Sequence, residues 1–348
     1  MNLPDRIKSF ELLGDILRRY HEDSTGKDLF SIVKATTIAA SVNPWFTPEH
    51  IRIGLNNLGQ ILTPEKIHHW LSAYKKSMER ISVHKDIGVV MAGNIPAVGF
   101  HDFLCVLISG HKLTAKLSSS DNLLLPAMAN ILFDYLPEWH EYISFTTGKL
   151  ENFDAILATG NSNTSRYFEF YFAKYPHIIR KSRNSIAVLT GDESILDLQN
   201  LADDIMLYFG MGCRSISKVF VPSGYDFSAL TYALGRYEDY ANHNKYRNNY
   251  EYFKSIFMLN QVSFLDTGFL LIKEDVTIPS RISVLHYEYY KSQDEVEDNI
   301  RANLDLIQCV ISKIPLSIKS LSPGEGQNPA LSDYSDHIDT MEFLLSLK

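Results

Sequence analysis

The sequence predicts an α/β protein in which a helical N-terminal segment precedes two parallel-sheet domains. Three features of the apolar pattern indicate this. Residues 5–80 repeat apolar side chains every three or four positions, residues 86–190 alternate short β-branched runs with helix-length segments, and a similar alternation resumes near residue 190. Strands that alternate with helices are typical of parallel sheets, because each parallel connection needs a crossover.

The N-terminal segment contains two clear helical patterns. Apolar residues recur at helical spacing in IKSFELLGDILRRY and in TPEKIHHWLSAYKKSM, and a Thr-Pro pair opens the second pattern. A threonine side chain accepts hydrogen bonds from the first N–H groups of a helix, and proline fits the first turn. We therefore expect these residues to form helices ahead of the first sheet.

Four strands are expected in the first domain, with a helical segment in each of the three intervals between them. The strands are 86–92, 112–118, 154–160 and 184–190, and the helical segments are 97–110, 122–136 and 164–175. The turns after the first three strands (93–96, 118–122 and 159–165) are rich in small and amide residues. Ligands of open α/β sheets bind at the carboxyl ends of the strands, so these turns are candidate binding sites. Neither GxGxxG nor GxxxxGK occurs, so a bound dinucleotide would have to be held without the usual glycine turn.

The second domain is expected to begin near residue 190. Its predicted elements are a helix at 196–210, a strand at 217–222, a Tyr-rich stretch at 232–257, a strand at 268–274 and a helix at 293–313. A Gly/Pro loop, 321–334, then leads to a terminal segment, 339–348, which we expect to return to the first domain.

Composition excludes several classes of function. The formal charge is −8, with 33 Lys+Arg against 41 Asp+Glu, which argues against nucleic-acid binding. The 12 histidines and 3 cysteines form no CxxC or HExxH motif, so we expect neither a disulfide framework nor a metal site. The N-terminus has no secretory or transit pattern, and the longest apolar stretches are interrupted by Gly, Asn and Pro. We expect a cytoplasmic protein without stable membrane insertion.

Cys213 is the candidate nucleophile. It lies in FGMGCRSISKVFVP, between the end of a predicted helix and the start of a strand. Turn residues leave backbone N–H groups able to point at a reacting oxygen, and the neighbouring Arg214 would lower the pKa of the thiol. Cys105 and Cys309 lie within apolar runs and are expected in the core. The alternative is that Cys213 is a packed, unreactive cysteine as well.

Four blocks of the sequence resemble one family. GNIPAVGFHDFLCVLISGHKLTAKLS, FDAILATGNSNTSRYFEFYF, FGMGCRSISKVFVP and GQNPALSDYSDHIDTMEFL are similar to the acyl-CoA reductases related to the fatty-acid reductase of bacterial bioluminescence, a branch of the aldehyde dehydrogenase superfamily. The blocks occur in the family's order from about residue 85 onward. The resemblance implies an aldehyde-dehydrogenase-like fold. It also implies a division into 1–189 (N-terminal helices and dinucleotide-binding domain), 190–310 (catalytic domain) and 311–348 (segment returning to the cofactor domain).

The resemblance implies an NADPH-dependent reduction of a fatty acyl thioester to the aldehyde. Cys213 matches the nucleophile that forms a covalent thioacyl intermediate and releases coenzyme A, and Asn94 matches the asparagine that shares the oxyanion hole. Hydrolytic aldehyde dehydrogenases carry a glutamate in the segment that matches HIIRKSRNSIAVL (177–189), which here contains no carboxylate. This favours reduction of a thioester over oxidation of an aldehyde to an acid. A purely local turn role is the alternative for Asn94.

The resemblance also implies a cofactor site. Lys116 matches a lysine that meets the adenosine ribose, and Ser119 stands where enzymes that prefer NAD often carry glutamate, so NADP+/NADPH is favoured. The N–H groups that open the following helix suit a pyrophosphate, and ordinary helix capping is the alternative. The residues concerned are Gly160, Asn161, Ser162 and Thr164. A solvated lysine at the end of a strand is the alternative for Lys116.

Other features stay open. The basic run KYPHIIRKSR is suited to binding cofactor or coenzyme A phosphates, and a solvated connector is the alternative. The Tyr-rich stretch either lines an acyl channel or packs a pair of helices. Gln327 is expected to occupy a structural turn. The resemblance implies an acyl-CoA or acyl-carrier substrate, an acyl-protein synthetase as a partner, and a homodimer. The competing functions are a thioesterase, an acyltransferase or an aldehyde dehydrogenase on the same fold, and a non-catalytic scaffold.

Overall fold

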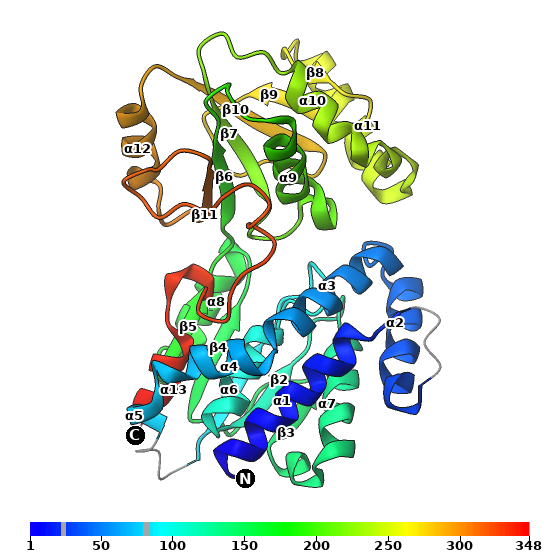
Figure 1. Ribbon diagram of the computed structural model, residues 1–348, viewed down its shortest axis with the longest axis vertical. Coiled ribbons are helices and arrows are strands. Elements are labelled where there is room, and N and C mark those ends of the chain that lie inside the picture. The colour runs from blue at the N-terminus through cyan, green and yellow to red at the C-terminus, as the bar shows by residue number, and fades with distance from the viewer. Residues whose placement is uncertain (22–25, 79–83, 348) are drawn as a thin grey trace. The chain divides into compact units, whose positions relative to one another are not determined.

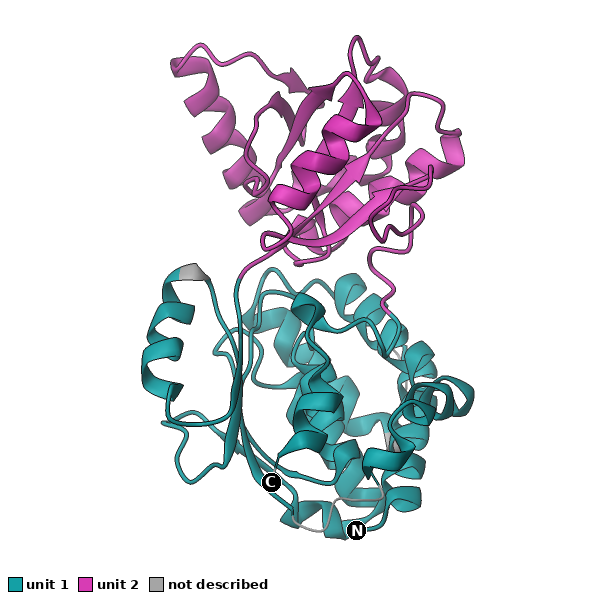
Figure 2. Cartoon of the chain, turned by 90° about the vertical axis from the view of Figure 1, so that its left-hand side faces the viewer, with its two compact units in different colours: residues 1–181, 330–348 teal, residues 182–329 magenta. Residues whose placement is uncertain are grey.

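The computed structural model describes residues 1–21, 26–78 and 84–347 (Figure 1). The chain divides into two compact units (Figure 2): unit 1 comprises residues 1–181 and 330–348, and unit 2 comprises residues 182–329. The boundaries predicted from the sequence and its resemblance are 189/190 and 310/311. The first boundary comes earlier because residues 184–188 pair with strands of unit 2. The second comes later because the chain beyond residue 311 returns to pair Leu321 with Ile311.

Unit 1 is built on a five-stranded parallel sheet with the strand order β3-β2-β1-β4-β5. The strands are β1 (Asp86–Val90), β2 (Lys112–Lys116), β3 (Ile143–Thr146), β4 (Ala155–Thr159) and β5 (His177–Arg180). The helices α6 (Phe100–Ser109), α7 (Leu124–Tyr135) and α8 (Ser162–Phe172) follow β1, β2 and β4. The chain moves outward from β1 to β3 and then resumes at β4 on the other side of β1, so the winding reverses between β1 and β4.

The composition of this sheet corrects the expectation from the sequence. β3 and β5 were not predicted, and the strand predicted at 184–190 belongs to unit 2 instead. β3 (ISFT) and β5 (HIIR) are four residues long and mix polar with apolar side chains, so neither shows the continuous apolar run of a buried parallel strand.

The N-terminal helices belong to unit 1. They are α1 (Leu3–Arg18), η1 (Lys27–Leu29), α2 (Phe30–Val42), α3 (Pro48–Ile61), α4 (Pro64–Ser72) and α5 (Lys75–Met78). The hydroxyl of Thr63 accepts a hydrogen bond from the N–H of Lys66 and caps α4, so the predicted Thr-Pro helix start is confirmed. α1 packs on α6 and α7, with Phe10 and Leu13 in the core. Residues 79 and 80 of the predicted helical segment lie outside the described residues.

The remaining helices of unit 1 complete its core. They are η2 (Pro137–Glu141), η5 (Ser335–His337) and α13 (Thr340–Ser346). α13 packs on α6 and places Met341 and Leu344 in the same core as the N-terminal helices.

Unit 2 is built on a six-stranded sheet with the order β11-β6-β7-β10-β9-β8, in which only the β8–β9 pair is antiparallel. The strands are β6 (Asn184–Val188), β7 (Ile216–Pro222), β8 (Leu265–Asp266), β9 (Leu271–Glu274), β10 (Val284–Tyr290) and β11 (Ile307–Ser312). The helices are α9 (Ile195–Met206), η3 (Leu207–Gly210), α10 (Ser228–Leu234), η4 (Gly235–Asn242), α11 (Asn244–Leu259) and α12 (Gln293–Ala302).

The helix predicted at 293–313 is wrong in its second half. α12 ends at Ala302, and residues 307–312 form the strand β11, whose six residues are all buried. A short turn at Asn303–Leu306 separates the two elements. The run IQCVIS is six residues long, and an apolar run of that length fits a buried strand and a buried helix segment equally well, so the sequence pattern does not distinguish them. The strand β10 was not predicted either, because its tyrosines and its histidine and glutamate interrupt the apolar run.

Candidate functional site

Cys213 lies in unit 2, in the turn between η3 and β7. Its side chain is partly exposed, whereas Cys105 and Cys309 are buried. Burial raises the pKa of the Cys105 thiol well above its usual value, with the nearby Asp102 carboxylate acting in the same direction. The expectation that Cys105 and Cys309 belong to the core is confirmed, and Cys213 differs from both in being reachable from solvent.

The backbone before Cys213 takes a strained path. Tyr208 and Phe209 both have left-handed backbone angles, with φ near +55° and +57°, and Gly210 follows with φ +70°. Non-glycine residues in this region cost roughly 1–3 kcal/mol each and persist only where the surroundings hold them. Here the Phe209 ring is held against Tyr240 and Tyr246, at centroid separations of 4.4 and 5.5 Å. These tyrosines of the Tyr-rich stretch therefore pack the turn that leads to Cys213.

Two serines fix the backbone of the cysteine turn, residues 210–215. The N–H of Gly212 donates to Ser215 Oγ at 3.2 Å. Ser185 Oγ donates to the carbonyl oxygen of Cys213 at 3.1 Å and accepts from the N–H of Cys309 at the same distance. The carbonyl of Cys213 is thus tied to β6 and β11, which leaves little freedom for the peptide that carries the thiol.

A second loop, residues 324–327, packs on the cysteine turn. Arg214 Nε donates to the carbonyl oxygen of Gly326 at 2.5 Å, so this guanidinium is anchored to the loop. Gln327 Nε2 donates to the carbonyl oxygen of Asp204 at 3.3 Å and to Ser215 Oγ at 3.4 Å. Gln327 therefore has a structural role beside Cys213.

Asp204 holds the far side of this loop and was not predicted from the sequence. It is fully buried, and its Oδ2 accepts from the N–H of Gly324 at 2.6 Å. Burial raises its pKa to about 6, although N–H groups of the loop oppose the rise. The available signal was its place in the amphipathic helix, three residues after Leu201 and next to Ile205, on the apolar side.

The predicted oxyanion and ribose residues lie on two turns at one edge of the sheet in unit 1. Asn94 follows β1, and Lys116 ends β2, with Ser119 in the turn beyond it. β1 and β2 are parallel neighbours with Val90 opposite Lys116, so their carboxyl ends share an edge. Asn94 and Ser119 are exposed, and Lys116 is half-buried.

The start of α8 shows helix capping. Asn161 is the N-cap, and its Oδ1 accepts from the N–H groups of Asn163 and Thr164 at 3.1 and 2.9 Å and from the Thr164 hydroxyl at 3.0 Å. Gly160 sits against Thr164, because a Cβ there would lie 3.1 Å from the Thr164 Cβ. The side chain of Ser162 lies outside the described residues.

The basic run at 174–183 is largely engaged within the protein. Arg180 is buried, forms an ion pair with Asp102 and donates to Thr340 Oγ1 at 2.7 Å. Lys181 pairs with Glu169 at 2.9 Å, and Arg183 donates to backbone carbonyl oxygens in unit 2. The phosphate-binding interpretation is therefore wrong for Arg180, whose charge is compensated internally.

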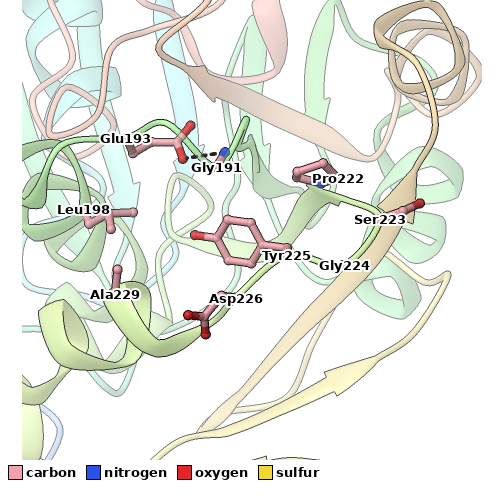
Figure 3. A pocket seen from close by; sticks show the side chains of 9 residues that line it. All are labelled: Gly191, Glu193, Leu198, Pro222, Ser223, Gly224, Tyr225, Asp226 and Ala229. Atoms are coloured by element: carbon pink, nitrogen blue, oxygen red, sulfur yellow. Dashed lines mark hydrogen bonds between the residues drawn. The ribbon is translucent and has the colours of Figure 1, made fainter.

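Unit 2 also has a pocket of about 260 Å³ at the carboxyl ends of β6 and β7 (Figure 3). The Tyr225 ring lies among its lining residues, and Glu193 accepts a hydrogen bond from the N–H of Gly191 at 3.0 Å. Cys213 precedes β7, whereas this pocket lies beyond Pro222 at the other end of the same strand. The pocket is therefore separate from the cysteine turn, and none of the predicted site residues lines it.

Among the residues that the structure describes, no group of three His, Cys, Asp or Glu side chains is arranged to hold a metal ion. None of the described helices combines the length and the apolar content needed to cross a bilayer.

The fold is similar to solved aldehyde dehydrogenases, at low sequence identity. Aldehyde dehydrogenase 21 from Physcomitrella patens, in complex with succinate, matches with a TM-score of 0.64 and 12% identity over 99% of this chain and 84% of its own. An aldehyde dehydrogenase from Bacillus cereus in complex with NAD+ matches with a TM-score of 0.59 and 15% identity. This match covers 90% of this chain and 72% of the other. Betaine aldehyde dehydrogenase from Staphylococcus aureus matches with a TM-score of 0.61 and 10% identity, over 91% of this chain and 72% of its own.

No protein-family model matches the chain, and no curated protein matches it. The structural likeness concerns the fold, and it agrees with the fold class that the sequence predicts. The chain therefore has an aldehyde-dehydrogenase-like α/β fold.

Proposed function

We propose that this protein reduces a fatty acyl thioester to the aldehyde, with NADPH as the reductant and Cys213 as the nucleophile. The observation that carries the proposal is the contrast among the three thiols, since only Cys213 is partly exposed and it lies in a turn that follows a strained stretch of backbone and is held by a second loop. The fold class adds support, because it is shared with oxidoreductases. Asn94, Lys116 and the α8 turn extend the proposal to unit 1.

The topology of unit 1 supports a nicotinamide dinucleotide. Its strand order, β3-β2-β1-β4-β5, is that of the dinucleotide-binding fold, in which the ligand binds at the carboxyl edge where the winding reverses. Here that point lies between β1 and β4, whose following turns carry Asn94 and Gly160. These turns of small residues would receive the dinucleotide in the absence of a GxGxxG motif. A pyrophosphate at α8 would replace the Asn161 side chain as acceptor for two N–H groups.

Lys116 and Ser119 would bind the adenosine ribose. Both lie at the carboxyl end of β2, next to β1 in the sheet. A serine has no negative charge to repel a 2′-phosphate, so we propose NADPH over NADH. When bound, this cofactor supplies the hydride that converts the acyl group to the aldehyde level.

Cys213 would accept the acyl group. Its thiolate attacks the thioester carbonyl carbon, a new C–S bond forms, the bond to the coenzyme A sulfur breaks, and coenzyme A leaves as the thiolate. The Asn94 side chain and the backbone N–H of Cys213 would stabilise the oxyanion, and one such donor is typically worth about 3 kcal/mol. Once the acyl carbon is reduced to the aldehyde level, the carbon–sulfur bond to Cys213 would break, which would release the aldehyde and restore the thiolate.

The lack of a general base favours reduction over hydrolysis. Residues 177–189 contain no Asp or Glu, and the structure places them in β5, β6 and their connection, with Ile178 and Arg180 buried. A water molecule near the acyl-enzyme would find no carboxylate from this segment to take its proton, so its attack should be slow. The acyl donor would be acyl-CoA, an acyl carrier or an acyl-protein synthetase. We also propose that the protein is a homodimer and lies in the cytoplasm.

One experiment tests the proposal and separates its rivals. Purified protein is mixed with acyl-CoAs of increasing chain length and NADPH, and the absorbance of the reduced nicotinamide, the free coenzyme A thiol and the intact mass are followed together. We expect a covalent acyl adduct, thiol release and NADPH consumption, all lost in Cys213→Ala and retained in Cys309→Ala. Thiol release without NADPH consumption indicates a thioesterase or acyltransferase, and no adduct with any acyl-CoA refutes the nucleophile.

A further inference from the structure

A buried carboxylate connects the two turns that carry the proposed oxyanion and ribose residues. We define the Asn94 turn as residues 93–97 and the Ser119 turn as residues 118–121. Asp121 is only 6% exposed, and its Oδ2 accepts a hydrogen bond from the N–H of Ala97 at 2.7 Å. The last residue of the Ser119 turn therefore bonds directly to the last residue of the Asn94 turn.

The two turns also fit against each other sterically. A Cβ added to Gly93 would lie 2.5 Å from Ser118 Oγ and 3.2 Å from the backbone nitrogen of Asp121, so only glycine allows this approach. The Ser119 turn is itself closed by a hydrogen bond from the N–H of Asp121 to the carbonyl oxygen of Ser118, at 3.2 Å. The turns meet at both ends, at Gly93 with Ser118 and at Ala97 with Asp121.

Ala97 needs this support, because its backbone is left-handed with φ +55°. A residue with a Cβ adopts that conformation at a cost, and it is kept where surrounding contacts determine it. The carbonyl oxygen of Ala97 accepts from the N–H of Phe100 at 2.9 Å and so closes the turn that leads into α6. The Asp121 bond on the N–H side and this turn on the carbonyl side together fix the peptides that follow Asn94.

Burying this carboxylate costs free energy, because one of its two oxygens is left without a hydrogen bond within the described part of the chain. Its second oxygen, Oδ1, is buried and has no hydrogen-bond partner among the described residues. The N–H of Leu124, the first residue of α7, also interacts with this carboxylate. One side chain thus joins the turn after β1, the turn after β2 and the start of α7.

We propose that Asp121 is a positioning residue that holds the Asn94 turn in the conformation needed for oxyanion stabilisation. The inference rests on the proposed function for its catalytic consequence, but the hold on the turn is a property of unit 1 by itself. Without the carboxylate, the Ala97 N–H loses its acceptor and the left-handed residue can relax. Asn94 then leaves its position, and a displacement of about 1 Å at such a site can slow a reaction about 100-fold.

The test combines backbone exchange with the rate of acylation in Asp121→Ala and Asp121→Asn. We expect hydrogen–deuterium exchange at residues 93–97 to become faster in Asp121→Ala and to stay near the wild-type rate in Asp121→Asn, whose amide oxygen still accepts. We expect the acylation rate constant of Cys213 with acyl-CoA to fall about 10- to 100-fold in Asp121→Ala, with a much smaller change in the half-saturating concentration. Asp121→Asn should recover most of that rate.

A matched control is available at the opposite edge of the same sheet. The exposed Asp154 also accepts a backbone N–H, that of Asp86 at 2.9 Å, but at the amino ends of β1 and β4. Asp154→Ala should change neither the exchange of residues 93–97 nor acylation.

The outcomes separate this inference from the proposed function. Wild-type exchange at residues 93–97 in Asp121→Ala overturns the hold on the turn, whether or not the protein is an acyl-CoA reductase. Faster exchange with an unchanged acylation rate overturns the positioning role. A wild-type protein that forms no acyl adduct refutes the proposed function and with it the catalytic consequence, while the exchange result still decides whether Asp121 holds the turn.

Discussion

Replacing Asp121 with asparagine should stabilise unit 1 at neutral pH. Burial raises the pKa of this carboxyl from 3.8 to about 6, against the opposing effect of the N–H groups of Ala97 and Leu124. The folded protein therefore binds the proton more tightly than the unfolded chain. The stability that comes from this difference is fully present below pH 3.8 and is lost as the pH rises through about 6.

The size of the effect follows from the same values. A rise from 3.8 to about 6 corresponds to about 3 kcal/mol between the protonated and ionised forms. Asparagine resembles the protonated form in size and charge and can still accept from the Ala97 N–H. We expect Asp121→Asn to increase the free energy of unfolding by about 1–3 kcal/mol at pH 7.5 and to change it little at pH 4.

Urea unfolding followed by tryptophan fluorescence measures this change in the right part of the molecule. The three tryptophans, at positions 45, 70 and 139, all belong to unit 1, as Asp121 does. The wild type and the variant are compared at several pH values between 4 and 7.5. Equal stability at pH 7.5, or the same pH dependence in both proteins, would refute the claim that the buried carboxylate destabilises the fold when it is ionised.

Three further predictions concern other parts of the molecule. Iodoacetamide should label the native protein once, at Cys213, and Cys213→Ala should abolish the label; modification of the buried Cys105 in the native state would contradict the exposure difference. Asp102→Ala leaves the buried Arg180 without its ion-pair partner, so unfolding by urea should show a loss of about 3–5 kcal/mol, and a loss below about 1 kcal/mol would argue against the pair. Gly326→Ala places a methyl 2.7 Å from a buried carboxylate oxygen, so the melting temperature of unit 2 should fall, by an amount equivalent to about 1–3 kcal/mol, and unchanged melting would show that the loop can move aside.

Much of the fold could be predicted from periodicity, because the central strands are buried on both faces. β1 and β4 are continuous apolar runs that end in small-residue turns, and both were found. The four-residue strands β3 and β5 and the strand β11 were not, since short or edge strands carry polar residues or resemble helical segments. Pairing is a long-range property, so the sequence pattern did not reveal that residues 184–188 join the sheet of unit 2.

The candidate site was predictable only where a residue type itself indicates chemistry. Cys213 is notable as a thiol beside a glycine turn, and its accessibility agrees with that interpretation. The residues that hold its turn, Ser185 and Gln327, are ordinary polar residues whose partners lie far along the chain. The same is true of Arg180: a basic run in the sequence suggests phosphate, but the side chain is buried against Asp102.

Two aspartates that were not predicted as important from the sequence share the same burial, hydrogen bonding and pKa shift. Asp121 in unit 1 and Asp204 in unit 2 are both buried, each accepts a backbone N–H from a neighbouring loop, and burial raises the pKa of each to about 6. A neutral or apolar side chain at either position would avoid the desolvation of a carboxylate. Each instead bonds to a loop that packs beside a proposed catalytic residue, Asn94 or Cys213. Ionisation at neutral pH lowers stability at both positions, whereas the hydrogen bond that each side chain accepts fixes an irregular stretch of backbone. The sheets give this protein its fold, but these two carboxylates hold the turns on which the proposed chemistry depends.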